Sequence, residues 1–201
     1  MSKTIVIAAS AFFGAGLGAT FAITRFGTTA AACGATAVAG GDIGGPFELV
    51  SETGETVTSA DVITEPTLVY FGYTFCPDVC PLDAARNAAA VDILAEQGIS
   101  VTPLFITIDP ARDTPEVVGD YTDNFHPKMI GLTGSDEQVD IASKAYRTYY
   151  QKADNDPEYY LMNHSTFTYL VTPDQGFVEF FKQPTLAEEV AEITACYVTS
   201  A

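Results

Sequence analysis

Two cysteines stand four residues apart in segment 75–81, which reads FCPDVCP. Cys76 and Cys80 share one face if this segment forms a helical turn, with their Cβ atoms about 5–6 Å apart. At that spacing the two sulfurs can form a disulfide after a small adjustment, or they can bind one metal ion. A helix N-terminus would stabilise both thiolates, because its free N–H groups and positive dipole end attract negative charge. The pair therefore predicts thiol chemistry or metal binding, with a structural disulfide as the simplest alternative.

The chain has two histidines, and one of them lies directly before a predicted buried strand. His164 precedes segment 166–171, whereas His126 follows a predicted helix end and is interpreted as a surface or capping residue. Two thiolates and an imidazole form a soft set of three ligands that suits copper. Structural zinc normally takes four protein ligands, and no fourth cysteine or histidine is evident. Cys76, Cys80 and His164 are therefore the candidate metal ligands.

The other two cysteines lie far from this pair in the sequence. Cys33 falls in a segment of small residues, and Cys196 follows Val190 and Ile193 at helical spacing. This spacing predicts that Cys196 is a buried, inert thiol. Four cysteines in 201 residues are too few for a disulfide-rich scaffold.

The elements that must position the candidate ligands alternate between strands and helices from residue 46 onward. The apolar runs 67–73 and 101–108 are typical of buried central strands. Residues 173–176 have turn chemistry and predict a hairpin. The other predicted strands are 47–50, 129–132, 166–171 and 177–181, and the predicted helices are 81–97, 113–125, 135–151 and 185–198. This order indicates an α/β, thioredoxin-like sandwich with a central mixed sheet.

Three of the predicted helices begin with cap residues. Asp113, Ser135 and Thr185 each precede a helical pattern, and each is followed three positions later by Glu or Gln. A side-chain oxygen at such a position accepts a hydrogen bond from the first turn, and the Glu or Gln reaches back to the cap residue. The pattern predicts helix starts at these three residues.

The N-terminal part of the chain is apolar. Residues 5–24 carry no charge and are flanked by Lys3 and Arg25. A membrane-spanning helix needs about 20 apolar residues, whereas the apolar part of a cleavable signal is usually about 7–15 residues long. We therefore expect residues 1–26 to form a transmembrane anchor with its N-terminus in the cytoplasm.

Residues 27–45 are rich in Gly, Ala and Thr and are expected to form a flexible tether to an exported domain over residues 46–201. Two alternatives change the fate of the N-terminal segment. Residues 30–32 could be a signal-peptidase site, and Ala32-Cys33 could be a poor lipoprotein site.

The charge balance excludes one class of function. Lys and Arg total 9 against 26 Asp and Glu, which gives a net charge of −17. Nucleic-acid binding through phosphate neutralisation is not expected from such an acidic chain. At 201 residues and 47% hydrophobic composition, the chain suits one folded domain with an appendage.

Several segments in order resemble the SCO/SenC copper chaperones, and together they span about residues 45–198. They are 71–81 (FGYTFCPDVCP), 108–115 (IDPARDTP), 125–127 (FHP), 131–134 (GLTG), and His164 before 169–171 (YLV). The resemblance implies a thioredoxin-like fold and a site for Cu(I), Cu(II) or both, with Cys76, Cys80 and His164 as ligands. It further implies delivery of copper to the CuA centre of cytochrome c oxidase subunit II. The apolar N-terminal segment corresponds to the family's usual anchor.

The sequence departs from the family pattern at Asn163, where the family often has Asp, and this bears on charge and hydrogen bonding around the ligand histidine. Asp78 and Asp113 match family positions and are interpreted as residues that cap helices and order loops, with a part in metal affinity or partner recognition as the alternative. Five tyrosines before the histidine are expected to cover its loop or pack on the core, with a docking surface for the oxidase as the alternative. They are Tyr146, Tyr149, Tyr150, Tyr159 and Tyr160.

The sequence thus predicts a membrane-tethered metallochaperone. The alternative is a thiol-disulfide oxidoreductase that reduces the cysteines of the CuA site, with Cys76 and Cys80 as its redox pair. A peroxidase-like role is disfavoured, because Arg86 is the only basic residue near the pair in the sequence. The expected partners are subunit II of the oxidase, other copper chaperones and thioredoxin-like reductases. No Arg- and Ser-rich transit segment precedes the apolar run, so the expected location is a bacterial inner membrane, with a single pass and the soluble domain in the periplasm.

Overall fold

The computed structural model describes residue 33 and residues 43–153 and 159–200. The predicted anchor at residues 1–26 lies outside these residues, as does most of the predicted tether. None of the helices in the described part of the chain has the length and apolar character needed to cross a membrane. Ile43 and Gly44 already belong to the fold, because Gly44 N donates to Ala145 O at 2.8 Å and Ile43 packs on the core.

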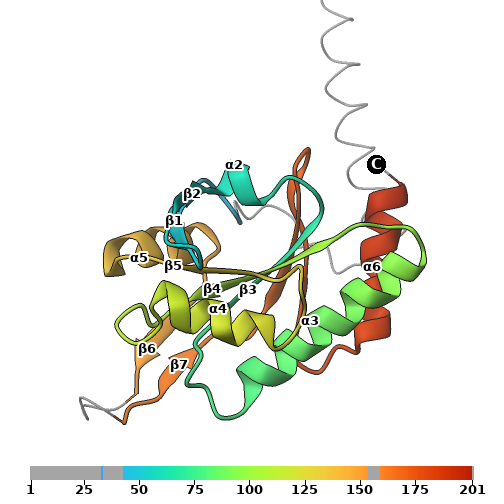
Figure 1. The fold of residues 1–201 in the computed structure, drawn as a ribbon. Helices are drawn as coiled ribbons and strands as arrows, with labels where there is room; N and C mark the ends of the chain where they lie inside the picture. Colours follow the sequence, from blue (N-terminus) through green and yellow to red (C-terminus); the bar gives the residue numbers. More distant parts are fainter. Residues whose placement is uncertain (1–32, 34–42, 154–158, 201) are drawn as a thin grey trace, which may run out of the picture.

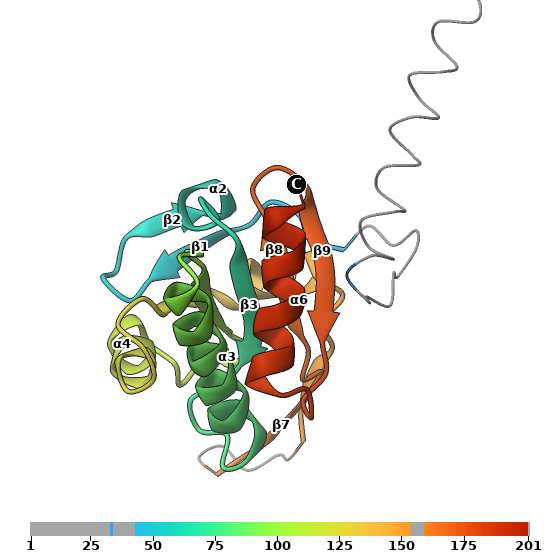
Figure 2. The ribbon, with the colours of Figure 1, turned by 90° about the vertical axis from the view of Figure 1, so that its right-hand side faces the viewer.

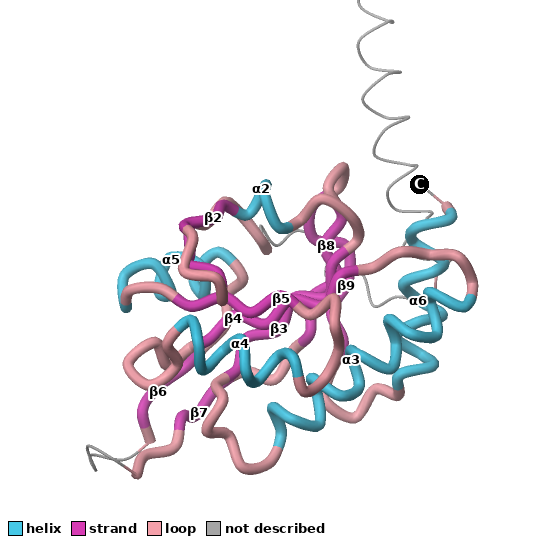
Figure 3. Tube along the Cα trace, in the orientation of Figure 1, coloured by secondary structure: helices cyan, strands magenta, loops and turns pink. Residues whose placement is uncertain are grey.

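A seven-stranded mixed sheet forms the centre of the domain (Figures 1 and 3). Its order is β2-β1-β5-β4-β3-β8-β9. The strands β3, β4 and β5 are parallel, while β1, β2, β8 and β9 pair antiparallel with their neighbours. The strands are β1 (Glu48–Ser51), β2 (Thr56–Thr58), β3 (Thr67–Gly72), β4 (Thr102–Thr107), β5 (Ile130–Thr133), β8 (Thr168–Thr172) and β9 (Gly176–Phe181). The predicted mixed α/β sheet is confirmed, and β3 and β4 are buried along their whole length.

Helices cover both faces of this sheet. They are α2 (Ser59–Val62), α3 (Val79–Glu96), α4 (Pro115–Asp123), α5 (Asp136–Ala145) and α6 (Ala187–Thr199). Figure 2 shows α3 and α6 side by side in front of β3 and β8. Alternation along β3 explains the two layers. A Cβ on Gly72 would lie 3.1 Å from Cys80 Sγ of α3, whereas Phe71 points to the other face and packs on Tyr146, which follows α5.

A small second sheet lies beside the main one and was not predicted. It pairs β6 (Tyr150–Lys152) with β7 (Met162–His164), and Tyr150 lies opposite His164. The predicted helix 135–151 is therefore too long, since α5 ends at Ala145. Arg147 adopts φ 53°, a left-handed conformation that stops the helix and redirects the chain into β6. The Thr and Tyr residues that follow favour strand.

The predicted caps have different outcomes. Ser135 forms a capping box with Gln138, as expected. The cap of α4 is Thr114 rather than Asp113, and Leu186 precedes α6 without any side-chain cap, so the predictions for Asp113 and Thr185 are wrong.

Cys196 is not the inert free thiol that its helical spacing predicted. It forms a disulfide with Cys33, with a Cα–Cα distance of 5.6 Å across 163 residues of sequence. Cys33 also belongs to a buried apolar cluster that includes Leu94 of α3 and Val190 of α6. Spacing alone does not reveal such a pairing, because the partners come together only in the folded chain. The disulfide attaches the segment before the domain to the last turn of α6.

Candidate metal centre

The three predicted ligands converge from three different parts of the fold. Cys76 lies in the loop after β3, Cys80 in the first turn of α3, and His164 at the end of β7. Their two sulfur atoms and one ring nitrogen all lie within 4.8 Å of one another. The distance from Cys80 Sγ to His164 Nε2 is 3.4 Å, and both cysteines are free thiols. The arrangement offers one ion two sulfurs and a nitrogen, which is the donor chemistry that suits copper.

Cys76 lies before the helix rather than on its face. The helix begins at Val79, and the backbone N–H of Cys80 donates to Cys76 Sγ at 3.4 Å. The sulfur thus occupies the place of a helix cap and accepts one of the free N–H groups of the first turn. Asp78, the residue at the cap position, makes no side-chain cap bond, so its predicted capping role is wrong.

The two thiols differ in acidity. A hydrogen bond from the Cys80 thiol lowers the pKa of Cys76 to about 3, and hydrogen bonds from backbone N–H groups add to this effect against the opposing effect of burial. The same interaction raises the pKa of Cys80 above its ordinary value, and burial raises it further. Cys76 is therefore the thiolate at neutral pH. Cys80 keeps its proton until a base removes it or a metal ion displaces it.

His164 presents its Nε2 atom to the cysteines. Its Nδ1 lies 2.8 Å from the carbonyl oxygen of Ser165, which can only accept, so Nδ1 carries the proton. Nε2 then has a free lone pair directed at Cys80. The rings of Tyr73 and Tyr70 meet the imidazole edge-on, with centroid distances of 5.8 and 6.5 Å. A hydrogen bond and two aromatic contacts thus fix the orientation of the ring.

Asp113 organises the loop that carries Cys76. Its carboxylate is fully buried and accepts hydrogen bonds from Thr74 N at 3.0 Å, Thr74 Oγ1 at 2.6 Å and Thr107 Oγ1 at 2.5 Å. Burial raises the pKa of Asp113, against the effect of these bonds. Asp113 therefore orders the loop, as interpreted from the sequence, whereas Thr114 takes the cap position of α4.

The other residues considered in the sequence analysis are His126, Asn163 and the five tyrosines, and none of them is a ligand of the centre. His126 accepts from Lys128 N at 3.0 Å and pairs with Asp92 at 3.3 Å, so it is not part of the centre. Asn163, which departs from the family pattern, is exposed on β7. Among the five tyrosines, Tyr146 and Tyr160 are buried, Tyr150 is half-buried, and Tyr149 and Tyr159 are exposed.

Residues around the centre that the sequence did not single out include Tyr73, Asp109 and Arg112. Tyr73 contacts the imidazole, and Arg112 forms an ion pair with Asp109 at 2.6 Å. The available signal was their position in the loops that follow two buried strands, β3 and β4, because such loops usually carry functional residues.

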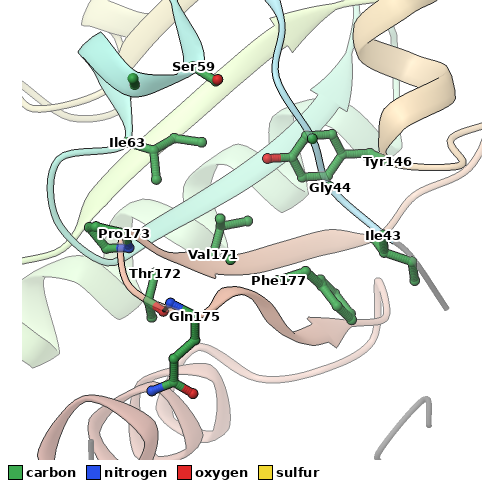
Figure 4. Close-up of a pocket in the computed structure, with 13 residues that line it drawn as sticks. Ile43, Gly44, Ser59, Ile63, Tyr146, Val171, Thr172, Pro173, Gln175 and Phe177 are labelled. Atoms are coloured by element: carbon green, nitrogen blue, oxygen red, sulfur yellow. Dashed lines mark hydrogen bonds between the residues drawn. The ribbon is translucent and has the colours of Figure 1, made fainter. Parts of the chain in front are cut away.

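A large cavity of the domain lies elsewhere. It measures about 520 Å³ and is bordered by Ile63, Tyr146, Val171 and Phe177, among others (Figure 4). Among the described residues, no cysteine, histidine or carboxylate borders this cavity, so they offer it no soft metal ligand.

The unequal thiols lead to a prediction about alkylation. Because only the thiolate reacts and the pKa of Cys76 is about 3, iodoacetamide should label Cys76 at nearly the same rate at about pH 8 and about pH 5. An ordinary cysteine, with a pKa of about 8.5, would slow several-hundredfold over this range. Mass spectrometry of the labelled peptides measures the rate.

The matched control for this prediction is Cys80→Ala. It removes the main hydrogen bond to the Cys76 sulfur, so the pKa of Cys76 should rise and labelling at about pH 5 should slow. A wild-type rate that climbs only through pH 8–9 would contradict the assignment of Cys76 as the thiolate.

Comparison with known proteins supplies the family. The family model described as SCO1/SenC matches residues 35–199. Protein SenC of Rhodobacter capsulatus is 51% identical over 205 residues, covering 98% of this chain and 91% of that protein.

Related proteins have been solved with copper bound. Arabidopsis thaliana ScoI with copper bound has a TM-score of 0.74 and 39% identity, over 78% of this chain and 99% of that one. Yeast Sco1 with copper bound has a TM-score of 0.75 and 35% identity, over 80% of this chain and 91% of that one. On the match to the family model and the identity to SenC, the chain belongs to the SCO1/SenC family.

Proposed function

We propose that this protein binds one copper ion through Cys76, Cys80 and His164 and delivers it to the CuA site of cytochrome c oxidase subunit II. One observation carries the proposal: two free thiols and an imidazole nitrogen lie within 4.8 Å of one another. The copper-bound structures of related proteins from Arabidopsis thaliana and yeast support copper as the ion. In this proposal residues 1–26 anchor the chain in the inner membrane, and the domain from residue 46 onward acts in the periplasm.

A second candidate function is reduction of the target's cysteines by thiol-disulfide exchange. The difference between the two thiols favours it. Cys76 is the thiolate and is slightly exposed, as an attacking thiol must be, and Cys80 is fully buried beside it, as suits a resolving thiol. The two functions share these sulfurs, but His164 separates them, since the exchange reaction does not require its Nε2 atom as a ligand.

His164→Ala therefore tests the proposal. Two thiolates alone can hold Cu(I) in a linear site, so Cu(I) binding should weaken without vanishing. Cu(II) prefers nitrogen ligands more strongly, so its dissociation constant should rise further, by about 10- to 100-fold or more. Competition titrations against chelators for each oxidation state, under anaerobic conditions, measure both constants. Cells carrying the variant should assemble less CuA-containing oxidase when copper is scarce.

His126→Ala is the matched control, because this second histidine lies outside the centre. It should leave both copper constants unchanged. Normal copper binding and normal oxidase assembly by His164→Ala would overturn the chaperone proposal and leave the reductase as the better account.

A further inference from the structure

Arg112 joins two segments that carry metal ligands, although it is not itself a ligand. Its Nε donates to Asp109 Oδ2 at 2.6 Å, and its Nη1 donates to the backbone oxygen of Tyr160 at 3.0 Å. The guanidinium also stacks on the Tyr160 ring, with Cζ 3.6 Å from the ring centroid. The Tyr160 hydroxyl donates to Asp109 Oδ1 at 2.7 Å and closes the cluster. We call Asp109, Arg112 and Tyr160 the Arg112 latch.

The guanidinium also contacts the loop that carries Cys76. Arg112 Cζ lies 4.7 Å from the Phe75 ring centroid and 5.9 Å from that of Tyr73. Arginine therefore bridges the cysteine loop and the segment that leads into β7 through aromatic stacking and directed hydrogen bonds. Lysine keeps the charge but lacks both the planar surface and the fork of N–H donors.

The segment that carries His164 needs such an attachment. β6 and β7 form a two-stranded sheet of their own, and a pair of strands is marginally stable by itself. One contact to the main domain is the Met162 N–H, which donates to Tyr73 Oη at 3.3 Å. The Arg112 latch holds the same strand pair at residue 160, just before β7.

We propose that Arg112 is a positioning residue that holds His164 Nε2 at the cysteine pair and thereby sets the affinity of the centre for Cu(II). This inference rests on the proposed copper function. The thiolates depend much less on the latch, because Asp113 orders the Cys76 loop through Thr74 and helix α3 carries Cys80. Loss of the latch should therefore weaken the nitrogen ligand and leave the sulfur pair in place.

Arg112→Lys tests the inference. Its Cu(II) dissociation constant should rise about 10- to 100-fold, as for other residues that orient a metal ligand, while the Cu(I) constant changes much less. Electron paramagnetic resonance of the Cu(II) form should lose nitrogen hyperfine structure. A double-mutant cycle with His164→Ala isolates the route: without the imidazole, Arg112→Lys should cause no further loss of Cu(II) affinity.

The copper-free protein gives an independent readout. Arg112→Lys should raise amide hydrogen exchange of the β6–β7 pair at least about tenfold, at the bonds from Ala153 N to Leu161 O and from Ser165 N to Tyr149 O. Arg86→Lys is the matched control. Arg86 is also largely buried and pairs with Asp83 at 2.9 Å, but it bonds to the carbonyls of Lys182 and Gln183 rather than to the latch. It should cost stability without changing β6–β7 exchange or the ratio of the two copper constants.

The outcomes separate the inference from the proposed function. Suppose that the wild type binds copper and that Arg112→Lys has the same Cu(II) affinity and the same β6–β7 hydrogen exchange. This result would overturn the positioning role of Arg112 and leave the proposed function intact. The positioning role is also overturned if Arg112→Lys lowers Cu(II) affinity as much in the His164→Ala variant as in the wild type, because the effect would then not act through the imidazole. Wild type that binds no copper overturns the proposed function, while exchange in the copper-free variant still decides whether the latch holds β7. If Arg112→Lys does not fold, Tyr160→Leu removes the stacked ring and the hydroxyl bond, and the same results are expected.

Discussion

Oxidation of Cys76 and Cys80 to a disulfide is expected to abolish copper binding, with a loss of Cu(I) affinity on the order of a thousandfold or more. Thiolates are the soft ligands of the centre, and a disulfide sulfur is no longer an anionic donor. The two sulfurs lie within 4.8 Å of each other, so they can approach without rebuilding the helix. Diamide, a two-electron oxidant, accepts the two electrons that the sulfurs release as the S–S bond forms. It takes up one proton from the Cys80 thiol and one from water, because Cys76 is already a thiolate.

The experiment compares reduced and diamide-treated protein in a Cu(I) competition titration, with peptide mapping of the disulfides. Reduction by dithiothreitol should restore full binding, which excludes irreversible damage. Cys76→Ser provides the matched variant, since it removes one thiolate without forming a bridge and should also bind poorly. Full copper binding by protein whose Cys76–Cys80 bond is mapped would refute the ligand assignment, and a bond from Cys76 to Cys196 would refute the pairing.

Removal of the Cys33–Cys196 disulfide is expected to lower the free energy of unfolding by about 2–5 kcal/mol. The physical reason is chain entropy: the bond closes a loop across 163 residues and restricts the unfolded chain. The double variant Cys33→Ser and Cys196→Ser avoids leaving a free thiol. Urea unfolding should show a lower midpoint for the double variant than for the oxidised wild type.

Copper affinity should stay unchanged in this double variant. Cys196 lies in the last turn of α6, and the C-terminal end of α6 is at the opposite end of the domain from β7 (Figures 1 and 2). Wild type with this disulfide reduced should match the double variant in stability. Equal unfolding midpoints for the oxidised wild type and the double variant would show that the bond contributes nothing.

Much of the architecture follows from local patterns in the sequence. Continuous apolar runs locate β3 and β4 within a residue or two, because a strand buried on both faces is apolar at most of its positions. The Ser135 and Gln138 pair marks the start of α5, since a capping box satisfies free N–H groups through residues three positions apart. Prediction from local patterns failed at the end of α5, where the left-handed backbone conformation of Arg147 interrupts a sequence pattern that looks helical.

The sequence by itself determined the identity of the three candidate ligands, because two cysteines at one-turn spacing and a histidine before a strand indicate a metal site or thiol chemistry. Only the tertiary structure decided how they work together. It placed Cys76 before the helix as an acceptor, directed His164 Nε2 at Cys80, and joined Cys33 to Cys196. These relations depend on contacts between residues far apart in the chain. Packing of the whole fold decides which residues meet, so spacing and periodicity in the sequence do not predict these contacts.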